Sequence, residues 1–213
     1  MADIPLKIPT VDEFKTLLTT EPIPYIVKEY VFGGETYAFK DNPSIVDDLK
    51  AFLSGKLDVK EENITIVGSA KIGFSLSPDT FSRKFHEESD IDIIVVDENI
   101  FNSIWFAILR WNYPRRYKLP HVERRWANKR ANDVFWGWFE PGKIKFKGLS
   151  FPSALKPLLD ISTLWFSTFK MVSSLDGFLG RDVNGRLYRT WDHAYEYHVD
   201  SLAKTREVLI NSN

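Results

Sequence analysis

The sequence predicts a mixed α/β fold, because two short apolar runs with the character of buried strands lie among segments with helical periodicity. The runs cover residues 64–67 and 90–96, are rich in β-branched residues and are bounded by turn formers. Segments before and after them carry apolar residues at spacings of three and four. We therefore expect a small mixed sheet with flanking helices and a C-terminal helical part.

The composition is that of one folded domain. The chain has 213 residues, 44% of them hydrophobic, and a formal net charge of −1. We expect a single domain over 1–213, with a core at about 42–147 and a helical extension at about 148–213. There is no cysteine, which excludes disulfides and thiolate metal sites, and no apolar run approaches the ~20 residues that span a bilayer. A soluble, cytoplasmic protein without a membrane segment is expected.

The N-terminal part predicts a helix and a hairpin. Thr10 and Glu13 have the spacing of a capping box, and the helix that they begin should end near Leu18. Two glycines at 33–34 separate apolar segments on either side, and such a pair is typical of a β-hairpin.

Two helices flank the predicted strands. Asn42-Pro43 should open the first, and Gly55 should end it. Asp97 is expected to cap the second, in which apolar residues follow at helical spacing as far as Ile108.

The C-terminal half predicts short strands and two longer helices. The runs 134–139 and 143–147 are interpreted as strands, the latter an edge strand protected by lysines. Segment 182–189 contains an Asn-Gly pair and is interpreted as a turn between short extended pieces. Helices are predicted over 155–175 and 191–209.

A basic stretch with interleaved aromatic residues follows the Asp97 helix. Its composition fits either a solvated face or a surface that binds phosphates and stacks bases. Against one acid, Glu123, its bases are Arg110, Arg115, Arg116, Lys118, Arg124, Arg125, Lys129 and Arg130.

The candidate chemistry lies at the ends of the two predicted strands. Asp90 and Asp92 are two apart in a strand, so their carboxylates share a face at a separation of about 7 Å. Their repulsion, about 2 kcal/mol at an effective dielectric of about 20, would become attraction towards a shared cation. Mg²⁺ takes carboxylate and phosphate oxygens. Gly68 and Ser69, directly after the first strand, offer N–H groups and a hydroxyl for phosphate oxygens.

These residues resemble the nucleotidyltransferase family of the DNA polymerase β superfamily, whose signature is a strand, Gly-Ser, and a later strand with Asp-x-Asp. Gly68, Ser69, Asp90 and Asp92 match that signature. The resemblance implies Mg²⁺-dependent transfer of a nucleoside monophosphate from an NTP to an acceptor, with release of pyrophosphate, and Mn²⁺ is an alternative metal. It implies that Asp90 and Asp92 bind the metals and that Gly68 and Ser69 hold the phosphates.

Several alternatives stay open. The family's third acid has no evident counterpart, so Asp133 is predicted as the nearest substitute and Asp182 as a more distant one. Without it, the protein would be a catalytically inactive module that binds a nucleotide or a partner. The acceptor is not determined: a nucleic acid such as RNA, a protein, a small molecule and a second nucleotide all fit. The Asp pair would also fit a solvated strand end.

A P-loop is disfavoured, because Phe74 replaces its lysine. Segment 77–89 is expected to be a loop over the site.

Overall fold

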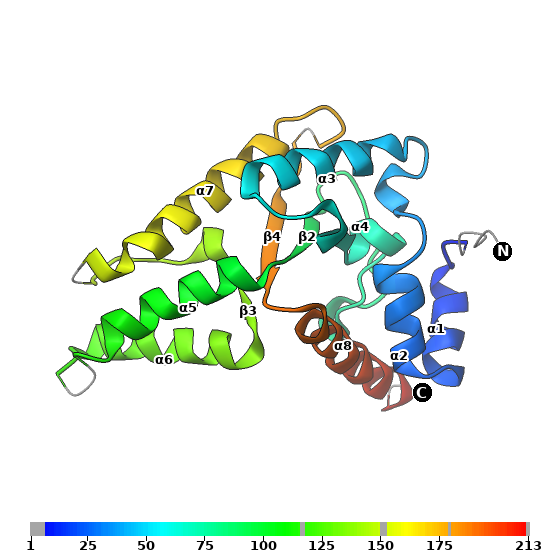
Figure 1. Cartoon of the computed structure of the whole chain (residues 1–213). Helices are drawn as coiled ribbons and strands as arrows, with labels where there is room; N and C mark the ends of the chain where they lie inside the picture. The colour runs from blue at the N-terminus through cyan, green and yellow to red at the C-terminus, as the bar shows by residue number, and fades with distance from the viewer. Residues whose placement is uncertain (1–6, 116–117, 150–152, 179, 212–213) are drawn as a thin grey trace.

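The computed structural model of the chain describes residues 7–115, 118–149, 153–178 and 180–211. Its centre is a four-stranded mixed sheet with helices packed on both faces (Figure 1), so the predicted fold class is confirmed. Among the described helices, none is long and apolar enough to cross a membrane.

Helices make up most of the described structure. They are α1 (Val11–Thr20), α2 (Ile23–Ile26), α3 (Ser44–Leu57), α4 (Ser69–Ile72), α5 (Glu98–Asn112), α6 (His121–Trp136), α7 (Lys156–Val172) and α8 (Trp191–Asn211). A π-helical segment at Val27–Phe32 directly continues α2.

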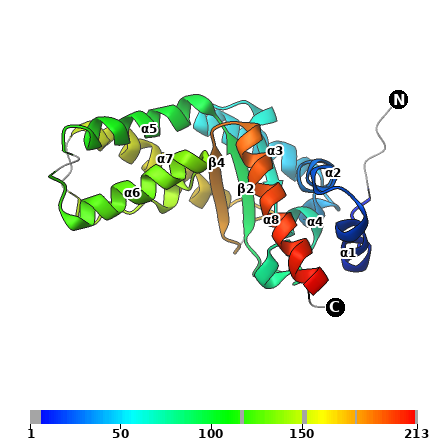
Figure 2. The same cartoon turned by 90° about the horizontal axis from the view of Figure 1, so that it is seen from below.

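The strands lie in the order β1–β2–β4–β3. β1 (Ile64–Val67) runs antiparallel to β2 (Ile91–Val96), which runs parallel to β4 (Val183–Tyr188). The two-residue β3 (Trp138–Phe139) pairs antiparallel with the end of β4. Both predicted strands of the candidate site are thus confirmed and are direct neighbours. A parallel pair requires a crossover, and here it passes through α5, α6 and α7, which extend away from the sheet (Figures 1 and 2).

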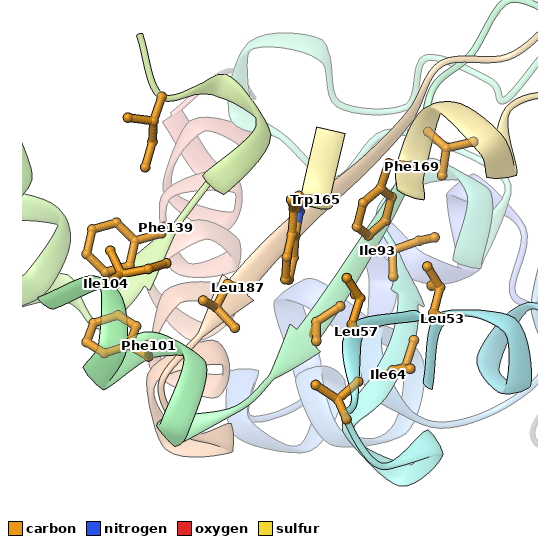
Figure 3. Packing of buried hydrophobic residues seen from close by; sticks show 14 of the residues in the cluster. Leu53, Leu57, Ile64, Ile93, Phe101, Ile104, Phe139, Trp165, Phe169 and Leu187 are labelled. Atoms are coloured by element: carbon orange, nitrogen blue, oxygen red, sulfur yellow. The ribbon is translucent and has the colours of Figure 1, made fainter. Parts of the chain in front are cut away.

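Alternation along β2 divides the core into two clusters. Ile91, Ile93 and Val95 face the cluster that α3, α5 and α7 complete (Figure 3). Ile94 and Val96 face the opposite cluster, which α1, α2 and α8 complete. Because both faces are covered, β2 is apolar except at Asp92, which lies where the strand begins.

The predicted helix caps are confirmed. The Thr10 hydroxyl accepts from the Glu13 N–H at 3.3 Å and the Glu13 carboxylate accepts from the Thr10 N–H, which completes the capping box. The Asp97 carboxylate accepts from the Ile100 N–H at 2.7 Å. Gly55, however, does not end α3, which continues to Leu57.

The predicted hairpin around residues 33–34 is wrong. The segment before the glycines is helical, and the segment after them forms a 3₁₀ turn at Tyr37–Phe39. Ile26, Val27 and Val31 are all buried in the cluster with α1 and α8. Their spacing is helical, so packing against those helices overrides the hairpin signal of the two glycines.

The strands predicted over 134–139 and 143–147 are largely wrong. α6 continues through Trp136, which leaves only Trp138–Phe139 as a strand. Residues 141–143 form a 3₁₀ turn, and no strand follows it in the described residues up to 149. A carbonyl of this segment, at Lys145, accepts from the indole N–H of Trp126, so the segment is held by α6 and not by a sheet edge.

The turn predicted within 182–189 is also wrong, since this segment is the continuous strand β4. The sheet therefore takes a central strand from beyond residue 147, and the predicted division between a core and a helical extension does not follow the sheet. Gly185 is needed here for packing: a Cβ at this position would overlap the ring of Phe169 from α7.

We expect Gly185→Ala to lower the free energy of unfolding by about 1–3 kcal/mol, the usual cost of overpacking a core. Urea denaturation would measure it. Phe169→Leu in the Gly185→Ala background should recover part of the loss, because it removes the overlapping ring. If the two changes were strictly additive, the overlap would not be the cause.

Candidate functional site

A cavity of about 580 Å³ opens where β1 ends and β2 begins, and the predicted residues Gly68, Ser69, Asp90 and Asp92 all line it. β1 and β2 are antiparallel with Val67 opposite Asp92, so the Gly-Ser turn emerges directly beside the carboxylates. The structure thus brings together four residues that lie up to 24 positions apart in the sequence.

Gly68 allows the close approach of the turn to the acids. Its φ of 70° lies in the region that favours glycine, and a Cβ there would lie 3.4 Å from Asp92 Oδ2. Ser69 is the first residue of the one-turn helix α4. The turn therefore places its backbone against the carboxylate without a side chain in between.

Asp90 and Asp92 differ in their surroundings. The amide of Asn184, on β4, donates to Asp90 Oδ2 at 3.5 Å. Asp92 is exposed towards the cavity, and partial desolvation by the surrounding protein raises its pKa. The guanidinium of Arg186 opposes that rise, and the charge of Asp90 adds to it. The two carboxylates supply oxygen ligands that suit Mg²⁺ or Mn²⁺.

Arg186 is a cavity residue that the sequence interpretation missed. It lies opposite Ile94 on the face of the sheet that carries Asp92. Its guanidinium is 4.6 Å from the ring centroid of Trp138 and 4.8 Å from that of Tyr197. This guanidinium, which lies over two aromatic rings, is a permanent positive charge at the edge of the cavity. The misreading of β4 as a turn hid it, because only strand pairing puts residue 186 beside residue 94.

Glu140, the residue after β3, is the second cavity residue that was missed. Its Oε1 is 3.5 Å from Nη2 of Arg186 and 3.3 Å from Nζ of Lys143. Its charge also contributes to the raised pKa of Asp92. Glu140 is therefore an acid of the same cavity, but it is engaged with two cations.

The structure does not bring Asp133 to the acidic pair. Asp133 lies on α6, is 8% exposed and forms an ion pair with Arg130 of the same helix at 3.0 Å. Burial raises its pKa. Asp182, the other predicted substitute, precedes β4 and lines a separate cavity. Within the described ranges, no three Asp, Glu, His or Cys residues gather closely enough to hold a metal ion. Because α6 continues through residues 134–136, Asp133 lies within that helix and pairs there with Arg130.

The P-loop alternative finds no support in the geometry. Phe74, which stands where that motif has its lysine, is 3% exposed and packs against Phe14 and Phe81. Lys71 is turned away as well, because its ammonium donates to the carbonyl of Gly34 at 2.7 Å. Burial lowers the pKa of Lys71 to about 8.

The predicted loop over the site is confirmed for segment 77–89. Ser77, Thr80, Arg83 and His86 all line the cavity. The guanidinium of Arg181 donates to the carbonyls of His86 and Ser89 and so ties the loop to the segment before β4.

α8 closes the other side of the cavity with Tyr197, His198 and Ser201. Burial lowers the pKa of His198 from 6.5 to about 4, and the nearby Arg186 acts in the same direction. The ring of His198 packs edge-on against Phe32 and Tyr197.

The lowered pKa of His198 predicts acid sensitivity. As the pH falls below 6.5 the unfolded chain protonates this residue while the folded protein does not, so stability should fall between pH 6.5 and about 4. At about 1.4 kcal/mol per pKa unit, a shift from 6.5 to about 4 limits the loss to at most about 3.5 kcal/mol. Urea denaturation of His198→Gln across this range should show a smaller loss than the wild type. His121→Gln, at an exposed site, is the control, and equal slopes for both variants would contradict the prediction.

Comparisons of the chain with protein-family models, with curated proteins and with solved structures gave no match in any of the three.

Proposed function

We propose that this protein is a Mg²⁺-dependent nucleotidyltransferase that moves a nucleoside monophosphate from an NTP to an acceptor and releases pyrophosphate. One observation carries the proposal: a Gly-Ser turn with backbone N–H groups and an Asp-x-Asp pair meet in one cavity, with Gly68 against Asp92. This is the arrangement that the resemblance to the nucleotidyltransferase family requires.

Each cavity residue has a role in this proposal. Asp90 and Asp92 would hold the metal, which when bound supplies charge neutralisation for the triphosphate and a more nucleophilic acceptor oxygen. Gly68 and Ser69 would bind phosphate oxygens through N–H groups and a hydroxyl. Arg186 would add a fixed positive charge for the departing phosphates. The raised pKa of Asp92 implies that protons compete with the metal at a higher pH than at an ordinary aspartate.

A second candidate, a module that binds nucleotide without catalysis, is favoured by a specific observation. Glu140, the further acid whose charge acts on Asp92 in this cavity, is paired with Arg186 and Lys143. In the enzyme, Glu140 would have to exchange its partners when the metal and NTP bind. In the binding module, the ion pairs would persist.

Incubation with each α-labelled NTP and Mg²⁺ or Mn²⁺, with RNA, DNA or protein as acceptor, separates the two candidates. The enzyme should release pyrophosphate and label one class of acceptor. Metal-dependent NTP binding by calorimetry without pyrophosphate in any reaction would establish the binding module instead. Absence of metal-dependent NTP binding would contradict both.

A further inference from the structure

From residue 110 onwards, the hairpin of α5 and α6 separates its charges between interior and surface. Its two acids in the range 110–136 are both buried: Glu123 is 2% exposed and its carboxylate is 2.7 Å from Arg115, while Asp133 pairs with Arg130. The exposed charged residues described in this range are therefore all positive. They are Arg110, Lys118, Arg124, Arg125 and Lys129.

This separation is not a consequence of the overall composition. The whole chain has a formal net charge of −1. A surface with positive charges only, on a chain of balanced charge, creates a local field that attracts polyanions.

Two exposed aromatic side chains end the same helix. Phe135 and Trp136, in the last turn of α6, are 75% and 62% exposed, and their rings pack edge to face with centroids 4.9 Å apart. At about 100° per residue, Arg125, Lys129 and Trp136 lie within about 40° of one another around the helix. These three residues form one stripe along α6, with the basic side chains Arg125 and Lys129 at one end and the aromatic Trp136 at the other.

The aromatic end of the stripe is the end nearest the cavity. α6 begins far from the sheet and runs towards it, and its last turn leads into β3 (Figures 1 and 2). Four positions after Trp136, Glu140 already lines the cavity, which is a reach of at most about 14 Å of extended chain.

We propose that α6 binds a single-stranded nucleic acid, with phosphates on Arg125 and Lys129 and bases stacked on Phe135 and Trp136. Positive charge complements the phosphate backbone, and exposed aromatic faces stack on unpaired bases of any sequence. The proposal rests on the proposed function in one respect: the bound strand would be the acceptor, with its end presented to the cavity. A folded protein partner would explain both features only if it presented an acidic surface, and it would leave the binding of single strands unexplained.

Fluorescence anisotropy with labelled single-stranded RNA, single-stranded DNA and a duplex tests the binding without NTP or metal. We expect both single strands, or RNA alone, to bind more tightly than the duplex. Arg125→Ala with Lys129→Ala should weaken binding about tenfold at low salt. It should also flatten the dependence on the logarithm of salt concentration by about 0.7 for each phosphate that these side chains no longer neutralise. Trp136→Ala should weaken binding at least about fivefold, because it removes a stacking surface.

Lys56→Ala with Lys60→Ala removes the same charge from exposed sites at and after α3 and is the matched control. Phe166→Ala, at an exposed aromatic residue of α7, controls for Trp136→Ala. No binding of either single strand at low salt, equal losses in the controls, or preference for the duplex would overturn the proposal. Asp90→Asn with Asp92→Asn should leave strand binding intact, so failure of nucleotidyl transfer and failure of strand binding give different results.

Discussion

Replacing Asp90 and Asp92 together by asparagine is expected to reduce the affinity for Mg²⁺-NTP at least about 100-fold while the protein stays folded. Two carboxylates are the only charged ligands that the proposal gives the metal. At about 4 Å and an effective dielectric of about 20, each pair of unit charges is worth about 4 kcal/mol, so a loss of about 100-fold is conservative. Isothermal titration calorimetry with and without Mg²⁺ would measure it.

In the absence of metal, the variant with both Asp90 and Asp92 replaced should be at least as stable towards unfolding as the wild type at neutral pH. Burial and the charge of Asp90 raise the pKa of Asp92 above its unfolded value, so the ionised form is unfavourable in the folded protein. Stability is therefore lost as the pH rises through the raised pKa, and asparagine removes that loss.

Asp47→Asn with Asp48→Asn is the matched control, because it removes two exposed carboxylates from α3, away from the cavity. It should leave Mg²⁺-NTP affinity unchanged. Unchanged affinity in the Asp90/Asp92 variant would remove the metal site from the proposal.

Replacing Arg186 by methionine is expected to weaken Mg²⁺-NTP binding by about tenfold or more, the usual worth of a charge-assisted hydrogen bond. Binding of Mg²⁺ alone should not weaken, because a positive charge near Asp92 is removed. The two affinities, measured by calorimetry, should therefore change differently.

Arg189→Met is the control for this change. Arg189 follows β4, forms an ion pair with Glu98 and lies over Trp105, outside the cavity. If Arg186→Met lowers stability but leaves NTP affinity as in the control, Arg186 only supports the fold through Glu140 and the two aromatic rings.

The sequence by itself determined the features that depend on near neighbours. The caps at Thr10 and Asp97 are bonds between residues three positions apart, so their spacing predicts them. Both strands of the site are apolar runs, and the shared side of Asp90 and Asp92 follows from strand periodicity. The resemblance to the nucleotidyltransferase family then joined the Gly-Ser turn and the acidic pair into one proposed site.

Only the tertiary structure decided what depends on distant partners. Segment 182–189 carries a local turn signal, yet pairing with β2 and the packing of Phe169 on Gly185 make it a strand. That pairing, together with β3, brings Arg186 and Glu140 to the cavity, and no local pattern indicates it.

The basic stretch shows the same division. Its composition was evident from the sequence. Which of its charged side chains are buried and which are exposed, however, depends on how α5 and α6 pack. The ion pairs of Glu123 with Arg115 and of Asp133 with Arg130 put the acids inside, because burying a charge is tolerated only when it is paired. The uniform positive charge of the surface is therefore a product of tertiary packing.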